Sequence, residues 1–214
     1  MAMTDRPIII VGCGPGSPEY LTDAARHAVE HAGLLIGADR LLELFPDTKA
    51  ERIAVGADIA AVLHTMEIRL GKVPMVVLVT GDPGMHSLAR PVLRHFGRAL
   101  CRIIPGVSSV QAAFAAAGVD WMNARILSAH KTVPDIDPRE LAPVDKIAVL
   151  AGSPAALRWI GELAERLAPR WIFVCEELTL PGETVTKVSA EMLARMEASP
   201  RTVVLLLRPG VWDV

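Results

Sequence analysis

The chain has few aromatic residues, few cysteines and no strong excess of charge of either sign. Aromatic residues make up 4% of its 214 residues, too few for the stacking platforms that bind single-stranded RNA. Its 22 basic and 24 acidic residues are interspersed and give a formal net charge of −2, which argues against nucleic-acid binding. Cys13, Cys101 and Cys175 are widely spaced and odd in number, which predicts neither a disulfide framework nor a zinc site.

Long apolar runs are also absent. Hydrophobic residues make up 51% of the chain, but no run approaches the ~18 residues of a membrane span. The first residues lack the apolar core of a signal peptide. We therefore expect a cytoplasmic protein with no membrane or nucleic-acid partner.

Strand-like and helix-like segments alternate along most of the chain. Strands are expected over residues 8–11, 34–36, 53–55, 75–79, 101–104, 124–128, 147–150, 171–175 and 202–207, and helices over 22–33, 40–45, 59–70, 87–96, 108–117, 155–167 and 189–196. This alternation is typical of α/β domains with mostly parallel sheets. Because the first half already contains a complete alternating unit, we expect two small α/β domains, over residues 1–117 and 118–214.

Residues 12–22 follow the first predicted strand and are rich in glycine and proline. They depart from the G-x-G-x-x-G spacing of a dinucleotide-binding turn. Pro15 and Pro18 remove two amide donors, and the next helix begins only near Thr22. The segment is therefore predicted to be a stiff loop that lines a pocket and binds phosphate poorly.

Two further loops are expected at the same edge of the first sheet, because ligands bind beyond the carboxyl ends of parallel strands. Residues 80–84, Thr-Gly-Asp-Pro-Gly, follow one strand, and residues 105–109, Pro-Gly-Val-Ser-Ser, follow another. Taken singly, the first is also a good turn and the second a good helix N-cap. Three such loops after three strands favour a shared ligand site.

The motifs G-x-G-P-G-x-P-E-x-L-T, T-G-D-P-G and I-P-G-x-S-S resemble those of the tetrapyrrole methylases, which transfer methyl from S-adenosylmethionine to corrinoid or porphyrinoid carbons. The resemblance covers essentially the whole chain. It implies two α/β domains, S-adenosylmethionine bound in the cleft between them, and a homodimer. Residues 35–43 and 127–130 are similar to the branch that methylates C5 of precorrin-6Y or cobalt-precorrin-7 in cobalamin biosynthesis.

The resemblance also implies which residues meet the methyl donor. They are Pro15, Thr80, Gly81, Asp82, Met85, Ser108, Ser109, Ala151 and Gly182. Asp82 could bond the ribose or ammonium of the donor, or form an Asx-turn that stiffens its own loop. Methyl transfer to carbon needs no protein nucleophile; alignment of donor and acceptor supplies roughly 7–11 kcal/mol.

A precorrin carries many carboxylates, so cationic residues near the matched segments are substrate-binding candidates. They are Arg40, Arg125 and Lys131, although Lys131 stands where the family pattern has glycine. His130 is a candidate for substrate binding or proton transfer. Neither His130 nor His86 has a partner at metal-ligand spacing, and the other four histidines, His27, His31, His64 and His95, fall on predicted helices as surface or satisfied residues. No metal site is therefore expected.

We therefore predict an S-adenosylmethionine-dependent methyltransferase acting at C5 of a precorrin or cobalt-precorrin. Alternatives are a methyltransferase of the same fold acting on another precorrin position, on ribosomal RNA or on the diphthamide precursor, and a non-catalytic tetrapyrrole-binding partner. A nicotinamide-dependent oxidoreductase fits poorly, because Gly37 stands where an acidic residue is required. The chain is either a stand-alone C5 enzyme or the N-terminal half of a fusion with a C15-methyltransferase/decarboxylase module.

Overall fold

The computed structural model describes residues 6–211, which divide into two compact units between Ser108 and Ser109. This division lies earlier in the chain than the boundary expected near residue 117. The difference is one helix, α5 (Ser109–Ala116), which packs against β10 (Thr202–Leu207) of the second unit and buries Phe114 completely. Helical periodicity identifies such a helix but does not say which sheet it covers.

The first unit contains a five-stranded sheet in which all neighbouring strands are parallel. Its strands are β1 (Ile8–Gly12), β2 (Leu34–Gly37), β3 (Glu51–Ala54), β4 (Met75–Val79) and β5 (Cys101–Ile104), in the order β3-β2-β4-β1-β5. β1 therefore lies between β4 and β5, with Gly12 paired to Val79. The carboxyl ends of all five strands lie at one edge, and the segments that follow β1, β4 and β5 are adjacent.

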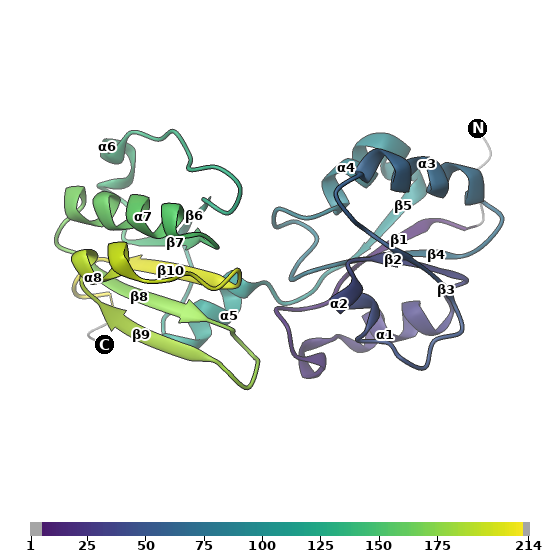
Figure 1. Ribbon diagram of the computed structural model, residues 1–214, viewed down its shortest axis with the longest axis horizontal. Helices are drawn as coiled ribbons and strands as arrows, with labels where there is room; N and C mark the ends of the chain where they lie inside the picture. Colours follow the sequence, from purple (N-terminus) through teal and green to yellow (C-terminus); the bar gives the residue numbers. More distant parts are fainter. Residues whose placement is uncertain (1–5, 212–214) are drawn as a thin grey trace. The chain divides into compact units, whose positions relative to one another are not determined.

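Helices cover both faces of this sheet (Figure 1). α1 (Asp23–Glu30) and α2 (Asp39–Leu42) pack on one face, and α3 (Ile59–Arg69) and α4 (Ala89–Phe96) on the other. Alternate strand residues supply the two cores: Val76 and Leu78 of β4 face the first pair of helices. Met75, Val77 and Val79 face the second pair. The continuous apolar strands are thus buried on both sides, as expected of a parallel sheet.

The second unit contains a mixed five-stranded sheet in the order β6-β7-β10-β8-β9. Its other strands are β6 (Arg125–Ser128), β7 (Lys146–Leu150), β8 (Trp171–Glu176) and β9 (Thr184–Val188). β6 and β7 are parallel, whereas β10 is antiparallel to both β7 and β8. The carboxyl ends of β6, β7 and β8 therefore share one edge.

Helices also cover both faces of the second sheet. α6 (Pro138–Leu141), α7 (Pro154–Arg166) and α8 (Ala190–Arg195) contribute to the core on one face, and α5 packs on the other (Figure 1). Both units are thus α/β, as predicted. Within residues 6–211, no helix combines the length and apolar character needed to cross a membrane.

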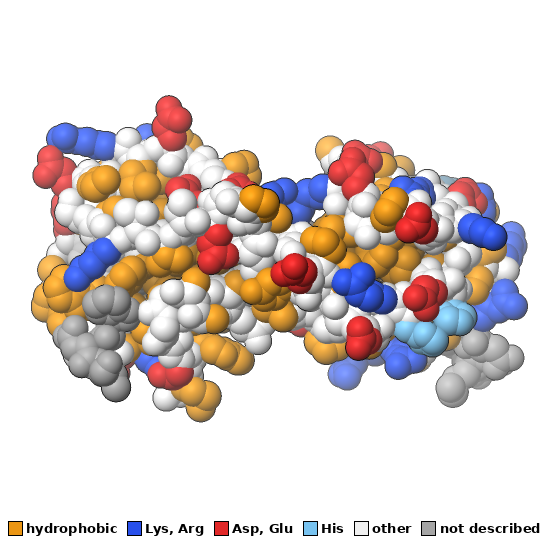
Figure 2. Space-filling model, turned by 90° about the horizontal axis from the view of Figure 1, so that it is seen from below, with side chains coloured by type: hydrophobic (Ala, Val, Ile, Leu, Met, Phe, Trp, Pro, Cys, Tyr) orange, Lys and Arg blue, Asp and Glu red, His pale blue; other side chains and the backbone are white. Residues whose placement is uncertain are grey.

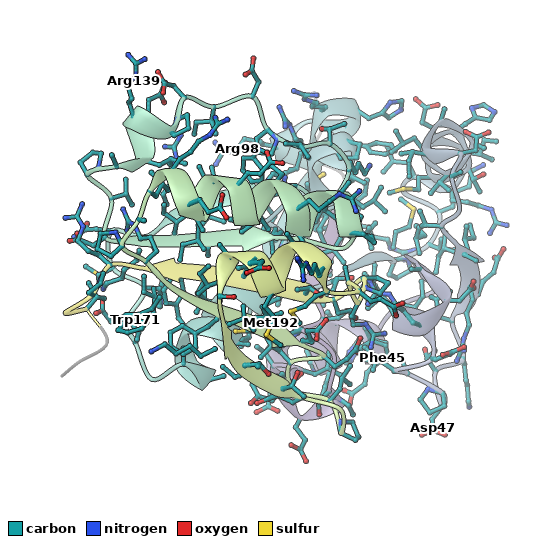
Figure 3. The ribbon with its side chains drawn as sticks, turned by 60° about the vertical axis from the view of Figure 1, so that its left-hand side comes forward. Phe45, Asp47, Arg98, Arg139, Trp171 and Met192 are labelled. Carbon is teal, nitrogen blue, oxygen red and sulfur yellow. The ribbon has the colours of Figure 1, made fainter. Side chains whose placement is uncertain are left out.

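Strand β9 was not predicted from the sequence. Four of its five residues are exposed, so it lacks the apolar run that identifies the other strands. Its β-branched residues pair antiparallel with β8, and the Lys187 ammonium lies 3.0 Å from the centroid of the Trp171 ring. Trp171 begins β8 (Figure 3). Cross-strand contacts of this kind stabilise a strand that burial alone would not.

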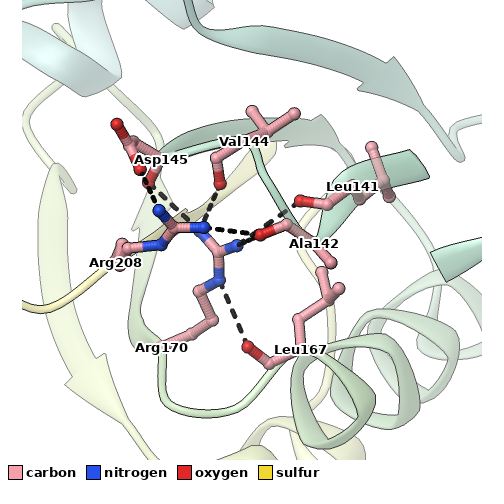
Figure 4. Close-up of polar contacts among 7 residues, drawn as sticks. All are labelled: Leu141, Ala142, Val144, Asp145, Leu167, Arg170 and Arg208. Atoms are coloured by element: carbon pink, nitrogen blue, oxygen red, sulfur yellow. Dashed lines mark hydrogen bonds and ion pairs between the residues drawn. The ribbon is translucent and has the colours of Figure 1, made fainter. Parts of the chain in front are cut away.

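Residues 141–144, which lead from the end of α6 toward β7, are held by Arg170 (Figure 4). Its guanidinium donates hydrogen bonds to the carbonyl oxygens of Val144 at 2.6 Å, Ala142 at 3.2 Å and Leu141 at 3.4 Å. Nε donates to Leu167, which follows α7. One side chain thus connects the end of α6 to the end of α7, and burial lowers the pKa of the Arg170 guanidinium below its ordinary value.

Candidate functional site

The loops that follow β1, β4 and β5 meet at the carboxyl edge of the first sheet. The Cys13 amide donates to the Val79 carbonyl at 2.9 Å, which extends the β1–β4 pairing by one residue. Gly14 and Gly81 then exchange two backbone hydrogen bonds, of 3.3 and 2.8 Å, in an isolated bridge. The predicted meeting of these loops at one edge is confirmed.

Three glycines allow the loops to pack backbone against backbone. A Cβ atom on Gly12 would lie 2.6 Å from both the Gly106 nitrogen and the Gly81 oxygen. One on Gly106 would lie 2.5 Å from the same Gly81 oxygen. Contacts this short exclude any side chain at Gly12 and Gly106, because the obstructing atoms are backbone. The three loops therefore act as one rigid surface.

Asp82 joins the loop after β4 to the loop after β5. Its Oδ1 accepts a hydrogen bond from the Gly84 amide at 2.8 Å, which is the Asx-turn considered from the sequence. Its Oδ2 accepts from the Gly106 amide at 3.2 Å. The side chain is half-buried, and an ionised carboxylate has about four lone-pair sites, so a further donor can still be accommodated.

The other candidate residues of the first unit, for donor or substrate, lie at the same edge. Arg40, a substrate-binding candidate, is the second residue of α2, just after β2, and its guanidinium donates to the Thr80 hydroxyl at 2.6 Å. Pro15 and Ser108 are buried, and Met85 is half-buried. His86, next to Met85, is exposed and has a φ of 46°, a left-handed conformation that is uncommon for a residue with a side chain. Ser109, which follows Ser108, is half-buried and belongs to the second unit, where it begins α5.

In the second unit, His130 and Ala151 lie together at the shared carboxyl edge of β6 and β7. The His130 Nδ1 is 3.4 Å from the Ala151 carbonyl oxygen, and the Ala151 amide donates to Thr202 at 2.9 Å. A Cβ atom on Gly152 would lie 2.5 Å from His130 Nδ1, so glycine at that position makes the approach possible. Neither contact follows from sequence spacing, because the residues meet only through strand pairing.

Gly182 lies in the turn between β8 and β9, at the same edge of the second sheet, and is exposed. Its turn begins with Glu177, which has a φ of 48°. The Glu177 carboxylate accepts hydrogen bonds from the Ser199 hydroxyl and from Arg201, the latter at 2.9 Å. These contacts hold the pKa of Glu177 below its ordinary value, with the Ser199 hydrogen bond the larger cause. Glu177 was not identified from the sequence.

Arg125 and Lys131 do not form one cluster. Arg125 is the first residue of β6, whereas His130 and Lys131 follow its last residue. An extended chain advances about 3.3 Å per residue, so Arg125 and His130 lie about 16 Å apart along the strand direction. Arg125 therefore lies at the opposite edge of the sheet from His130, although the two residues are close in sequence.

The cysteine nearest the first edge is not a nucleophile. Burial raises the pKa of the Cys13 thiol to about 12, so the thiol stays protonated near neutral pH. Cys175, buried in β8 of the second unit, is similar, and burial raises its pKa to about 12. Neither thiol supplies the thiolate that covalent catalysis would require.

The first edge offers a ligand both an anionic group, Asp82, and a cationic one, Arg40, which suits a small molecule that carries polar groups of both signs. The backbone of Gly12, Gly81 and Gly106 forms the centre of this edge. The Asp82 carboxylate and the Thr80 hydroxyl lie two residues apart in the loop after β4. A helix N-terminus that could bind a pyrophosphate does not follow β1 directly. Residues Pro18–Tyr20 form a short 3-10 helix first, and α1 begins only after the Thr22 N-cap.

Comparison with known proteins identifies the relatives of this chain. Residues 7–194 match the family Tetrapyrrole (Corrin/Porphyrin) Methylases. The cobalt-precorrin-7 C(5)-methyltransferase of Salmonella typhimurium is 33% identical over 180 residues, which cover 83% of this chain and 88% of that protein.

Two solved structures share the fold. The precorrin-6Y methylase of Archaeoglobus fulgidus, named for cobalamin biosynthesis, is 24% identical, with a TM-score of 0.73 over 94% of this chain and 98% of its own. The uroporphyrin-III C-methyltransferase of Thermus thermophilus, complexed with S-adenosyl homocysteine, is 23% identical. Its TM-score is 0.74, over 94% of this chain and 91% of its own.

Proposed function

The chain belongs to the tetrapyrrole methylase family, and we propose that it transfers a methyl group from S-adenosylmethionine to C5 of a precorrin or cobalt-precorrin in cobalamin biosynthesis. The observation that carries the proposal is the rigid surface formed by the loops after β1, β4 and β5. The substrate is supported by the name of the Salmonella relative, which aligns along most of both chains.

For the methyl donor, the proposal uses the residues at the edge of the first sheet. S-adenosylmethionine supplies an electrophilic methyl group on a sulfonium when it is bound. We propose that Thr80, Asp82 and Met85 contact its methionine and ribose portions. Asp82 carries the negative charge that suits a cationic donor, and its hydrogen bonds to Gly84 and Gly106 keep the carboxylate in place.

The same proposal assigns Pro15, Gly81, Ser108 and Ser109 to the walls of the donor site, and Ala151 and Gly182 to the adenine. In this proposal these residues align donor and acceptor and exclude water, because methyl transfer from a sulfonium to carbon needs no protein nucleophile.

For the macrocycle, we propose that Arg40, His130 and Lys131 contact carboxylates or move a proton after methylation. Arg40 is exposed and already directed to the donor edge by its hydrogen bond to Thr80. His130 is exposed, with Nδ1 directed to the Ala151 carbonyl. Arg125 lies at the other edge of its sheet, which makes it the weakest of the four candidates.

We further propose a cytoplasmic homodimer, with a separate or fused C15-methyltransferase/decarboxylase module acting on the same macrocycle. Large exposed apolar side chains, among them Trp121 at 51% and Met122 at 67% exposure, are consistent with a protein interface. Sedimentation velocity measures the oligomeric state directly.

The test of the reaction is incubation with donor labelled in its methyl group and a panel of precorrin and cobalt-precorrin intermediates. We expect one added methyl per macrocycle by mass spectrometry, located at C5 by NMR. Methylation at another carbon would keep the enzyme class and overturn the substrate. Methylation of ribosomal RNA, with steep salt dependence, would replace the macrocycle altogether.

Donor binding is tested separately by calorimetry with S-adenosylmethionine and S-adenosylhomocysteine. Failure of both to bind at high micromolar concentration would overturn the enzyme and leave a tetrapyrrole-binding protein. Thr80→Val is the matched variant for this assay, because it keeps the side-chain shape and removes the hydroxyl. We expect it to weaken donor binding without changing the unfolding midpoint by much.

A further inference from the structure

One group of potential metal ligands lies on α1, away from the residues assigned to the donor. His27, Glu30 and His31 follow the spacing H-x-x-E-H, which places their side chains on one face of a helix. The sequence alone predicts His27 and His31 to be surface or satisfied residues of a helix, with no metal site. The ligand atoms of the three residues all lie within 4.8 Å of one another.

These side chains face solvent because the opposite face of α1 is buried. Ala25, Ala28 and Val29 contribute to the core, while the side chains of His27 and Glu30 are 76% and 67% exposed. Figure 2 views the molecule from the side on which α1 lies in Figure 1, and histidine side chains are open to solvent there. An ion from solution can therefore reach the group without any opening of the fold.

A backbone contact orients the His31 ring. Its Nδ1 lies 2.9 Å from the His27 carbonyl oxygen, one helical turn earlier. A carbonyl oxygen only accepts hydrogen bonds, so Nδ1 is the donor in this contact, and in the neutral imidazole Nε2 then carries the lone pair. Metal-binding histidines are commonly oriented in this way, with the second ring nitrogen donating to a carbonyl or carboxylate.

The distances among the three groups suit one ion. Zinc binds imidazole nitrogen at about 2.0–2.1 Å and carboxylate oxygen at about 2.0–2.2 Å, so two ligand atoms on one ion are at most about 4.3 Å apart. His27 Nδ1 and Glu30 Oε2 are already 3.7 Å apart. The two imidazole rings are centred 4.4 Å apart and tilted by 52°. Side-chain rotations that shorten the longest of these separations to about 4.3 Å or less would bring all three onto a common centre.

We propose that His27, Glu30 and His31 form a binding site for a divalent transition-metal ion, with water completing the coordination. Two imidazoles and one carboxylate favour ions of intermediate softness such as Zn²⁺, Ni²⁺ or Cu²⁺ over Mg²⁺ or Ca²⁺. The site spans the last turn of α1 and His31, which follows it. A bound ion therefore ties the end of this helix together and stabilises the folded first unit.

The test is titration of the protein, free of any histidine tag, with Zn²⁺ in a calorimeter, with no donor or macrocycle present. We expect one saturable equivalent, and His27→Gln or His31→Gln should weaken it by at least about tenfold, the lower bound seen for loss of an orienting neighbour. Glu30→Gln should have a smaller effect in the same direction. Circular dichroism establishes that each variant is folded.

His64→Gln is the matched control. His64 is also exposed on a helix and lies 3.5 Å from Glu67, whose other oxygen is 2.7 Å from His95. Within residues 6–211, however, the ligand atoms of these three residues do not all come within 4.8 Å of one another, as those of His27, Glu30 and His31 do. We expect the zinc affinity of His64→Gln to equal that of the wild type. Nitrogen-15 NMR should show zinc bound to Nε2 of His31 with the proton retained on Nδ1. The proposal is overturned by the absence of saturable binding, by equal affinity in His31→Gln, or by loss of binding in His64→Gln.

Discussion

Replacement of Gly106 by alanine should separate the three loops that form the donor edge. The new methyl group would lie 2.5 Å from the Gly81 oxygen and 2.7 Å from backbone atoms of Gly12. Overpacking typically costs about 1–3 kcal/mol, and the cost here should be near the upper value because backbone cannot rotate away as a side chain can. Loosening the two Gly14–Gly81 hydrogen bonds adds about 0.5–1.5 kcal/mol each.

We therefore expect Gly106→Ala to lose about 4–6 kcal/mol of unfolding free energy, measured by urea denaturation. Circular dichroism is the appropriate signal, because the tryptophans, residues 121, 159, 171 and 212, all lie beyond the first unit. Hydrogen exchange should accelerate in peptides from the loops after β1, β4 and β5. Donor affinity should fall by at least tenfold if loop alignment is needed for binding, which corresponds to about 1.4 kcal/mol.

Gly56→Ala is the matched control. A Cβ atom there meets nothing within 4 Å, and the backbone is not in the left-handed region. Alanine should be neutral or stabilise by about 0.4–1 kcal/mol, through reduced entropy of the unfolded chain. Equal stability and equal donor affinity in Gly106→Ala and Gly56→Ala would refute the argument that close backbone packing forms the site.

Three further predictions concern side chains. Asp82→Asn keeps one side-chain oxygen that can accept a hydrogen bond from a loop amide, so it should bind S-adenosylmethionine more tightly than Asp82→Ala. Equal affinities of the two variants in calorimetry would assign the loss to charge alone. Arg170→Met should lower the unfolding free energy by about 2–4 kcal/mol, because the part-buried carbonyls of Leu141, Val144 and Leu167 lose a charged donor at about 1 kcal/mol each. An unchanged urea midpoint would contradict this. Burial raises the pKa of the Cys13 thiol to about 12, so between pH 9 and 12 the unfolded chain binds fewer protons than the folded chain. The unfolding free energy therefore falls as the pH rises through this range. Urea denaturation should show a shallower fall in Cys13→Ala, by up to about 1.4 kcal/mol per pH unit.

The sequence predicts most of this fold because local patterns carry it. Apolar runs such as the one at β4 mark strands that are buried on both faces, and Thr22 marks the start of α1. The exposed strand β9 and the four-residue helix α6 were missed because neither buries an apolar run. Their stability comes from contacts with distant residues, Lys187 with Trp171 and Arg170 with the end of α6.

What the sequence by itself determined is the family, the α/β class and the three loops, since these depend on glycine, proline and apolar residues in a fixed local order. Only the tertiary structure decided which groups meet. Strand order brought Asp82 to the Gly106 amide and His130 to Ala151, and it placed Arg125 at the opposite edge of its sheet. Pairing between strands far apart in the chain sets these contacts, and no local pattern of residues encodes the order in which strands lie side by side.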